Sequence, residues 1–458
     1  MDLPVSEDRL RADIEATAEF GAIDAPEGHG RTVLTGTDAN GNAREYFADR
    51  LDEAGLDVRV DRVGNVAGRW TPDDVDPEAA PVAAGSHLDS VIEGGIFDGP
   101  LGVYAALEAV RAMQEAEADA TPERPVEVVC FTEEEGGRFS EGLLGSSIAA
   151  GVRPIEEALT LTDSDGVTLE SVLDGISYLG EGRLDASDWD AWLELHIEQG
   201  ARLESMGKEV GVVTTVTGIT HCDATITGET DHAGSTPMAT RTDALTAASE
   251  LTLDIERAGR RAAGVGVEAP NEEASVSMDG GGDAGDGNDG GSGGGGDSDS
   301  EGTTVATVGK IDARPNATNV VPGEVELGID IRDVEREPID RIVDGVRGKL
   351  SRLETERGVE TTLTRPLDVS PTPMAGRCRE TLNRAAERTE IEATELHSGA
   401  AHDTMHVARV ADTGMCFAPS RGGFSHSPRE WTDWADCAAA TRVFASALAE
   451  LAGYNRSV

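Results

Sequence analysis

The 458-residue sequence predicts an α/β protein with a second domain inserted into the first. Two observations predict this class. Short apolar, strand-like segments alternate with helix-period segments through most of the chain, and from about Val213 the pattern changes to longer alternating strands. With 38% apolar residues, the chain can fill the cores of two domains. We expect the first domain at 1–212, the inserted domain at 213–365 and the remainder of the first domain at 366–458.

The first domain is predicted from a repeated unit in which an apolar strand runs directly into polar residues. The unit occurs three times, in PVAAGSHLDS, VEVVCFTEEEGG and WLELHIEQG. Ligands of open α/β sheets bind beyond the carboxyl ends of the strands, so three polar clusters at three strand ends predict one shared site. The helices expected around these strands lie, in chain order, at 6–20, 42–55, 101–116 and 434–451.

The inserted domain is predicted to be a split βαβ unit, because its segments follow the order strand, helix, strand, strand, helix, strand. The strands are ITHCDATITGE, TVATVGKIDARP, GEVELGIDIRD and a last one near VETTLTRP, and the helices are at 241–262 and 336–356. Residues 264–303 interrupt this order with a stretch rich in Gly and Asp. Such a composition cannot bury a core, so we expect a disordered, solvated loop there.

The charge balance is strongly acidic. The chain has 87 Asp and Glu residues against 38 Lys and Arg, a formal net charge of −49, which excludes nucleic acid from the expected partners. One acidic loop does not account for this charge, because residues 264–303 hold ten acidic and no basic residues, and a net charge of −39 lies elsewhere. Lysine occurs only at 208, 310 and 349. We interpret this composition as the hydrated surface of a protein from a salt-loving cell.

The sequence also predicts a cytoplasmic protein. Its first 21 residues contain no apolar stretch beside positive charge, so no secretory signal is expected. No run approaches the roughly 18 apolar residues that span a bilayer, so no membrane is expected among the partners. The five cysteines are scattered and odd in number, which favours reduced core residues over disulfides or a thiolate metal site.

Histidine and carboxylate residues at the predicted strand ends are the candidates for chemistry. His87 follows a strand, and Asp89 is close enough in the following turn to hold one imidazole nitrogen while the other faces a metal. Asp98 lies between glycines, which allow its backbone to approach a neighbouring strand end. Alone, a His-x-Asp pattern is a weak signal, and an ordinary Asp-Gly turn is the alternative for Asp98.

Glu133, Glu134 and Glu135 form an acidic triplet directly after an apolar strand. Adjacent carboxylates repel each other unless a positive group lies among them, which predicts a metal or acid–base site. On so acidic a chain a solvated charge run is the alternative, and the position beside a fully apolar strand favours the site. His196 and His426 add two imidazoles, the second in SHSPRE ahead of a helix.

These candidates supply His, Asp, Glu and His groups from four strand ends. Mixed imidazole and carboxylate ligands suit zinc, and a carboxylate shared between two ions builds a two-metal site. Such a site lowers the pKa of water towards neutrality and polarises a carbonyl, while a spare carboxylate takes the proton. The implied reaction is hydrolysis.

Seven segments, in order and spanning about residues 6 to 437, resemble those of the M20 metallopeptidase clan. Within it they resemble the amidase, hydantoinase and carbamoylase branch, which holds N-carbamoyl-L-amino acid hydrolases, β-ureidopropionases and allantoate amidohydrolases. The resemblance implies a mixed-sheet, zinc-peptidase-like catalytic domain with an inserted ferredoxin-like α+β domain that acts as lid and dimerisation domain. The segments are GSHLDSVIEGGIFDGPLGVYAALEAV, EEEGGRF, LELHIEQGARLE, HAGSTPMATRTDA, PNATNVVPGEVELGIDIRD, SGAAHDTM and SHSPRE.

The resemblance also implies two divalent ions per subunit, Zn or Mn, with Co or Ni as alternatives that the same ligands bind. Asp98 would bridge the two ions, Glu134 would be the general base, and Glu133 would be a neighbour without a role. The implied ligands are His87, Asp98 and His196 for one ion and Asp98, Glu135 and His426 for the other.

Substrate contacts are implied in the same way. Arg332 matches the arginine that binds the substrate carboxylate, and Asn319 matches its partner; a guanidinium fork suits a carboxylate better than lysine does. Gln199, His232 and His402 match the remaining polar contacts around the scissile group. His232 would stabilise the oxyanion in the active site of the partner subunit of a homodimer, and a simple turn residue is its alternative.

His221 departs from the family pattern. Allantoate hydrolases resemble one another in having Arg at this position and many carbamoylases have an aromatic residue, so an imidazole fits neither group. We expect His221 to contact the substrate, but it does not identify that substrate.

The sequence therefore predicts a cytoplasmic, homodimeric, dinuclear hydrolase of a small anionic N-carbamoyl or ureido substrate, with an N-carbamoyl-L-amino acid as the first choice. Allantoate amidohydrolase and β-ureidopropionase are the alternatives within the class, followed by an N-acyl amino acid amidohydrolase or peptidase. A non-catalytic dimeric binding protein on the same scaffold is a more distant alternative, because every implied ligand and the general base are present.

Overall fold

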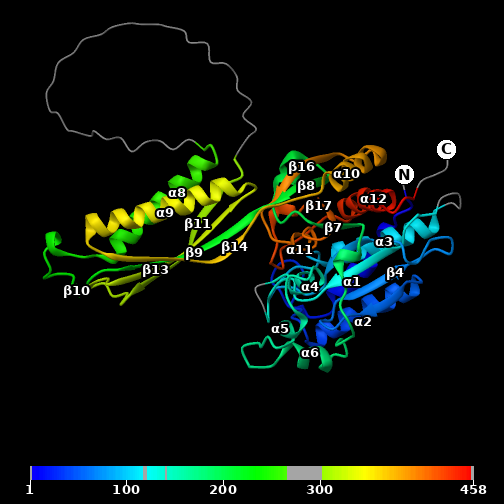
Figure 1. Cartoon of the computed structure of the whole chain (residues 1–458), viewed down its shortest axis with the longest axis horizontal. Coiled ribbons are helices and arrows are strands. Elements are labelled where there is room, and N and C mark those ends of the chain that lie inside the picture. The colour runs from blue at the N-terminus through cyan, green and yellow to red at the C-terminus, as the bar shows by residue number, and fades with distance from the viewer. Residues whose placement is uncertain (1–2, 117–120, 140–141, 266–301, 455–458) are drawn as a thin grey trace, which may run out of the picture. The chain divides into compact units, whose positions relative to one another are not determined.

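The computed structural model has two compact units, which Figure 1 shows. The first unit comprises Met1–Val216 and Thr372–Val458, and the second comprises Thr217–Pro371. Most of the loop expected at 264–303 lies outside the described residues. The described residues are 3–116, 121–139, 142–265 and 302–454.

A mixed sheet forms the centre of the first unit. Its nine strands in the described part of the chain follow the order β15-β8-β17-β7-β5-β6-β4-β3, with β16 also paired to β8. Strands β5, β6 and β7 are buried along their whole length, as expected for strands covered on both faces. The bounds are β3 Asp57–Val60, β4 Val66–Trp70, β5 Val82–His87, β6 Val126–Phe131, β7 Ala191–Ile197, β8 Val210–Val216, β15 Thr372–Pro373, β16 Ala393–Ser398 and β17 Asp412–Ala418.

Parallel pairing brings the polar ends of these strands to one edge. Strand β5 pairs in parallel with both β6 and β7, and β17 pairs in parallel with β7. The carboxyl ends of β5, β6 and β7 therefore lie at the same edge of the sheet. The three strands that the sequence predicted to run into polar residues are neighbours in space, although the chain connects them through long segments.

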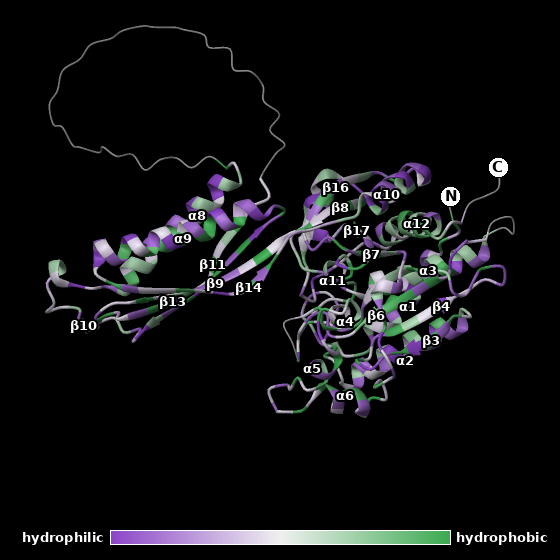
Figure 2. Ribbon diagram, in the orientation of Figure 1, coloured by the Kyte–Doolittle hydropathy of each residue, from purple (hydrophilic) through white to green (hydrophobic). Residues whose placement is uncertain are grey.

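Helices lie on both faces of this sheet, because residues of α3 and α12 pack in one apolar cluster with its strands and residues of α4 and α11 pack in another. Helix α3 packs on β5, and α12 packs on α3. Figure 2 shows hydrophobic residues on these helices and on the strands that they cover. Thr37 caps α2 by accepting from the backbone of Asn40, so this helix begins four residues before the expected 42–55. The longer helices are α1 Glu7–Ala18, α2 Asp38–Glu53, α3 Pro100–Glu115, α10 Gly376–Thr389 and α12 Trp434–Leu451. The shorter ones are α4 Leu144–Ala149, α5 Ile155–Leu159, α6 Leu169–Gly175, α7 Arg202–Met206 and α11 Thr404–Val407.

The second unit is a four-stranded antiparallel sheet in the order β11-β13-β9-β14, with α8 and α9 packed side by side on one face (Figure 1). Burial alternates strictly along β13, because every second residue faces the helices. This arrangement confirms the predicted split βαβ unit and, with the mixed sheet, the predicted fold class. The bounds are β9 Gly218–Thr227, α8 Ala244–Ala262, β11 Val305–Arg314, β13 Glu324–Asp333, α9 Arg336–Arg357 and β14 Glu360–Val369.

Among the described residues, no helix has the length and apolar character needed to cross a membrane. The five cysteines are all buried and unpaired, each surrounded by the core of its unit.

Candidate metal centre

The candidate ligands of the first unit come together at the carboxyl edge of the mixed sheet. His87 is the last residue of β5, Glu134 and Glu135 follow β6, and His196 is the next-to-last residue of β7. Asp98 lies in the loop that leads into α3. His426 joins them from the loop that precedes α12.

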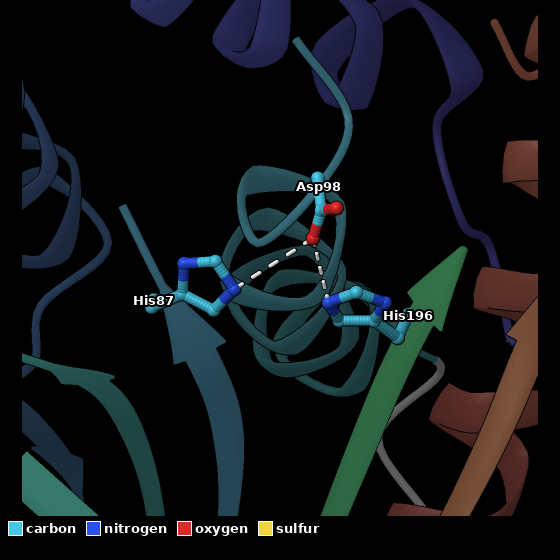
Figure 3. Close-up of side chains that lie close together, drawn as sticks. All are labelled: His87, Asp98 and His196. Carbon is cyan, nitrogen blue, oxygen red and sulfur yellow. Dashed lines mark ion pairs between the residues drawn. The ribbon is translucent and has the colours of Figure 1, made fainter. Parts of the chain in front are cut away.

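Asp98 lies at the centre of the group, and its two carboxylate oxygens face different neighbours. Oδ1 lies 3.8 Å from Nε2 of His87 and 3.0 Å from Nε2 of His196. Figure 3 shows the two imidazoles on either side of this oxygen. Oδ2 lies 3.6 Å from Nε2 of His426 and accepts a hydrogen bond from Nε2 of Gln199 at 2.7 Å. One oxygen of Asp98 thus faces His87 and His196 and the other faces His426, as a bridging ligand must.

The two buried imidazoles are oriented by backbone carbonyls. Nδ1 of His87 lies 3.1 Å from the carbonyl oxygen of Asp89, and Nδ1 of His196 lies 3.0 Å from that of Ile197. A carbonyl only accepts, so each Nδ1 carries a hydrogen, and Nε2 is the nitrogen left to face Asp98. The sequence predicted that Asp89 holds His87, and the contact is made by its backbone, since its carboxylate oxygen is 3.7 Å away.

Glu134 and Glu135 complete the group from the turn after β6. Oε2 of Glu134 lies 3.5 Å from Nε2 of His87, and Oε2 of Glu135 lies 3.4 Å from Nε2 of His426. Burial, reinforced by neighbouring carboxylates, raises the pKa of both glutamates well above the ordinary value. The apposition of several buried carboxylates therefore destabilises their charged forms unless a cation lies among them.

The donor set fits a divalent cation. Three sets of imidazole and carboxylate atoms each lie within 4.8 Å of one another, which is close enough for one ion to contact all three members. Nε2 of His87 is buried and has no hydrogen-bond partner among the residues that the structure describes. A buried nitrogen lone pair beside clustered carboxylates suits zinc or manganese. The sets are His87, Asp98 and His196; His87, Glu134 and Glu135; and Asp98, Glu135 and His426.

The turn that carries Glu134 and Glu135 is organised by Glu133, for which the sequence predicted no role. Glu133 has a positive φ of 54°, and its buried Oε1 accepts from the backbone N–H groups of Arg138 at 2.7 Å and Phe139 at 2.6 Å. Its carboxylate thus closes the turn from inside. The acidic triplet divides into one structural residue and two that face the centre.

Gln199 and His402 also lie near the centre, within the first unit. Gln199 bonds to Asp98, as above, from a backbone position with a φ of 55°. The ring of His402 packs edge-on against that of His196 at a centroid distance of 4.6 Å, and its Nε2 lies 2.9 Å from Oγ of Ser398. Burial lowers the pKa of His402 well below its ordinary value, so this imidazole is neutral.

The remaining predicted residues belong to the second unit. On the face of its sheet away from the helices, Asp330 pairs with His221 and with Arg332: Oδ2 lies 2.9 Å from Nε2 of His221, and the guanidinium donates from Nε and Nη2 at 2.9 and 3.0 Å. In a turn of the same unit, Nδ1 of His232 accepts from the backbone N–H groups of Gly234 at 3.0 Å and Ser235 at 3.1 Å. The carbonyl of Asn319 accepts from Ala233, directly after His232.

Glu430 is a buried residue at the centre that sequence reasoning missed. Its Oε1 accepts from the backbone N–H groups of Phe97 at 2.9 Å and Asp98 at 3.0 Å. Burial raises the pKa of Glu430 to about 8. The residue belongs to the recognised SHSPRE segment, but its partners lie more than 300 residues earlier, so no local spacing indicated the contact.

Imidazoles and carboxylates arranged in this way, at the carboxyl edge of a mixed α/β sheet, define the class of metal-dependent hydrolases. The chain belongs to peptidase family M20/M25/M40, whose pattern matches residues 77–450. Members of this family depend on metal ions. Within the family it belongs to the hydantoinase/carbamoylase amidase branch, which confirms the resemblance seen in the seven sequence segments.

Two curated relatives and one solved structure illustrate this placement. The chain is 36% identical over 441 residues to an N-carbamoyl-L-amino-acid amidohydrolase of Paenarthrobacter aurescens, covering 95% of this chain and 96% of the relative. It is 31% identical to an allantoate amidohydrolase of Bacillus subtilis, covering 96% of each. A hydantoinase/carbamoylase family amidase from Burkholderia multivorans has a TM-score of 0.84 at 32% identity, covering 98% of both chains. The protein is an amidohydrolase that acts on linear C–N bonds.

Proposed function

We propose that the protein hydrolyses the carbamoyl C–N bond of an N-carbamoyl-L-amino acid and releases the amino acid, ammonia and CO2. The observation that carries the hydrolytic part is the position of Asp98, whose two oxygens face two separate imidazole groups. The choice of substrate is supported by similarity to relatives named for that activity.

Two divalent ions, Zn or Mn, with Co or Ni as alternatives, would supply the Lewis acidity that lowers the pKa of water and polarises the substrate carbonyl. The first would be held by His87, Asp98 and His196, and the second by Asp98, Glu135 and His426. Backbone carbonyls orient two of the three imidazoles in advance, which reduces the reorganisation needed for binding.

Glu134 would move the proton. Its carboxylate faces the first set of ligands, with Oε2 at 3.5 Å from His87. Burial and the neighbouring carboxylates raise its pKa, and bound cations would oppose that shift and keep the carboxylate ionised, ready to accept a proton. Glu134 would take a proton from the attacking water at Oε2 and return it to the leaving nitrogen.

His232 would donate a hydrogen bond to the oxygen that gains charge as the carbonyl is attacked. Because its Nδ1 accepts from Gly234 and Ser235, the hydrogen of the neutral ring must be on Nε2. The local turn therefore fixes the tautomer that a donor to an oxyanion needs. We propose that this donor serves the partner subunit of a homodimer.

Arg332 and Asn319 would bind the substrate carboxylate. Asp330 fixes the plane of the Arg332 guanidinium through two hydrogen bonds, so less freedom is lost when an anion binds. Gln199 and His402 would contact the substrate near the scissile group. Both lie against candidate ligands in the first unit.

Allantoate is the second candidate substrate. His221 is placed beside Arg332 by their common partner Asp330, so polar groups gather where many carbamoylases carry an aromatic residue. Similarity to an allantoate amidohydrolase supports this alternative. A polar group at this position suits a substrate with a second ureido arm better than one with an apolar side chain.

A substrate panel tests the proposal. Ammonia release would be measured with N-carbamoyl-L-amino acids, ureidopropionate and allantoate, and release of the free amino acid with N-acetyl-L-amino acids, in high KCl with added Mn²⁺ or Zn²⁺. N-Carbamoyl-L-amino acids should give the highest kcat/KM. A higher value for allantoate would replace the proposed substrate, and release from none of the ureido compounds would contradict the proposal.

The expected compartment and salt dependence belong to the same proposal. We propose a cytoplasmic enzyme that works at high salt, on the basis of its net charge of −49 and its three lysines. An anionic substrate is repelled by so acidic a protein in dilute buffer, and salt screens that repulsion.

A further inference from the structure

Two loops far apart in the sequence meet behind the candidate metal centre. The first, residues 94–99, carries Asp98, and the second, residues 424–433, carries His426. The side chain of Glu430, from the second loop, lies against the backbone of the first and is only 1% exposed. This side chain connects the loop of the bridging carboxylate with the loop of the one candidate ligand that is half exposed.

The contact acts on the backbone of Asp98 itself. Both N–H groups, of Phe97 at 2.9 Å and of Asp98 at 3.0 Å, donate to the same oxygen of Glu430. Both hydrogen bonds are buried, where water does not compete for the donors or the acceptor and a hydrogen bond is stronger than at the surface. Together they fix the two peptide planes next to Asp98, and hence the direction in which its side chain leaves the backbone.

The first loop is shaped to admit this carboxylate. A Cβ atom at Gly95 would lie 2.2 Å from Cδ and from Oε1 of Glu430, which no side chain could tolerate. Glycine at this position therefore permits the approach of Glu430. The fit involves close packing as well as hydrogen bonds.

Residues 29–31, which include the short strand β2 Gly30–Arg31, form hydrogen bonds with both loops. The fully buried Arg31 donates from Nε to the carbonyl of Gly95 at 3.2 Å, and its backbone N–H donates to Gly94 at 3.0 Å. The N–H of His29 donates to the carbonyl of Pro428, in the second loop, at 2.8 Å. The two loops are thus connected in two ways, directly by Glu430 and indirectly through residues 29–31.

We propose that Glu430 is a positioning residue that holds the loop of Asp98 against the loop of His426 and thereby sets the affinity for the second metal ion. This inference rests on the proposed roles of Asp98 and His426 as ligands. In this proposal Glu430 contacts neither the substrate nor an ion. It accepts a hydrogen bond from the backbone of Asp98 and lies on the loop that carries His426.

The test compares two replacements of similar size in the full chain. Glu430→Gln keeps an oxygen that can accept from both N–H groups, whereas Glu430→Met keeps the volume and removes the acceptor. Each metal-stripped protein would be titrated with Mn²⁺ to give the number of ions and both dissociation constants. Loss of an outer hydrogen-bonding partner typically weakens metal binding about 10–100-fold, and we expect this loss in Glu430→Met and not in Glu430→Gln. The loss should be larger for the second ion, because Asp98 and His426 both lie on the loops that Glu430 connects.

The matched control is Glu127→Met. Glu127 is as buried as Glu430, lies at the opposite end of β6 from the centre and pairs with Arg59 and Arg69. We expect this variant to lose thermal stability and to bind both ions as the wild type does. Electron paramagnetic resonance adds a readout that general destabilisation does not change, because two Mn²⁺ ions sharing a carboxylate are magnetically coupled and Glu430→Met should lose that signal.

Each outcome decides the proposal. Wild-type affinity for both ions in Glu430→Met would overturn it, as would equal losses in Glu430→Gln and Glu430→Met, or an equal loss in Glu127→Met. If Glu430→Met does not fold, Glu430→Asp replaces it, because its carboxylate is one methylene too short to reach both N–H groups and should also lose the second ion. A wild-type protein that binds no Mn²⁺ would instead contradict the proposed function.

Discussion

Oδ1 of Asp98 lies 3.0 Å from Nε2 of His196, and in the absence of a cation the two side chains form a buried ion pair. Burial alone would lower the pKa of His196, but the adjacent Asp98 outweighs it and raises that pKa to about 9. The same contact, together with His87, holds the pKa of Asp98 well below its usual range against the effect of burial. A cation and a proton therefore compete for the same nitrogen.

This competition predicts that metal binding releases protons. Below the raised pKa of about 9, His196 of the metal-free protein is protonated, so a binding ion must displace that proton. We expect at least one proton released per subunit near pH 7.5, and an affinity that rises with pH up to about pH 9. Calorimetric titration in buffers of different ionisation enthalpy measures both quantities, and binding without proton release would contradict the assignment of His196.

Replacing Glu134 by Gln should separate proton transfer from metal binding. Glu134→Gln removes the proton acceptor but leaves the two ligand sets that share Asp98, so metal content should stay at the wild-type level while kcat falls by about 10²–10⁴-fold. The neighbouring change Glu135→Gln is the control and should lose one ion. A near-normal kcat in Glu134→Gln would remove this residue from the mechanism.

The pair between Asp330 and Arg332 should control substrate binding. Asp330→Asn weakens the two charge-assisted hydrogen bonds that fix the guanidinium, so KM should rise about tenfold while kcat changes little. Asp223, two residues along β9 from His221 and on the same face, offers a matched control in Asp223→Asn. Equal effects of the two substitutions would indicate that loss of negative charge, and not the pair with Arg332, is responsible.

Salt should act on binding as well as on stability. Because the substrate and the protein are both negatively charged, KM should fall as KCl rises from dilute buffer towards molar concentrations, where the Debye length is about 3 Å. The measurement is restricted to salt concentrations at which circular dichroism shows folded protein. A KM that is independent of KCl over that range would exclude the electrostatic explanation.

Much of the centre could be predicted from the sequence because its signals are local. Four of the candidate residues lie at or just after the end of an apolar strand, and parallel pairing brings those ends together. They are His87, Glu134, Glu135 and His196. The order of segments in the inserted domain was likewise enough to predict its four-stranded sheet.

Contacts between distant segments could not be predicted in this way. Glu430 is separated from Asp98 by 332 positions in the sequence. Its partners are backbone N–H groups, which nearly every residue type has, so the residue types do not indicate the contact. The orientation of His87 depends on the carbonyl of Asp89 and not on its carboxylate, a distinction that the sequence cannot make. The role of Glu133 in closing its turn was hidden for the same reason, since its partners are the backbone of residues 138 and 139.

The most direct test of the account is the metal dependence of ammonia release from an N-carbamoyl-L-amino acid. Protein stripped with a chelator should release no ammonia, and activity should return in proportion to added Mn²⁺ or Zn²⁺ until two ions per subunit are bound. Ammonia release that persists in the stripped protein, or fully metal-loaded protein that leaves every carbamoyl and ureido substrate intact, would contradict the account.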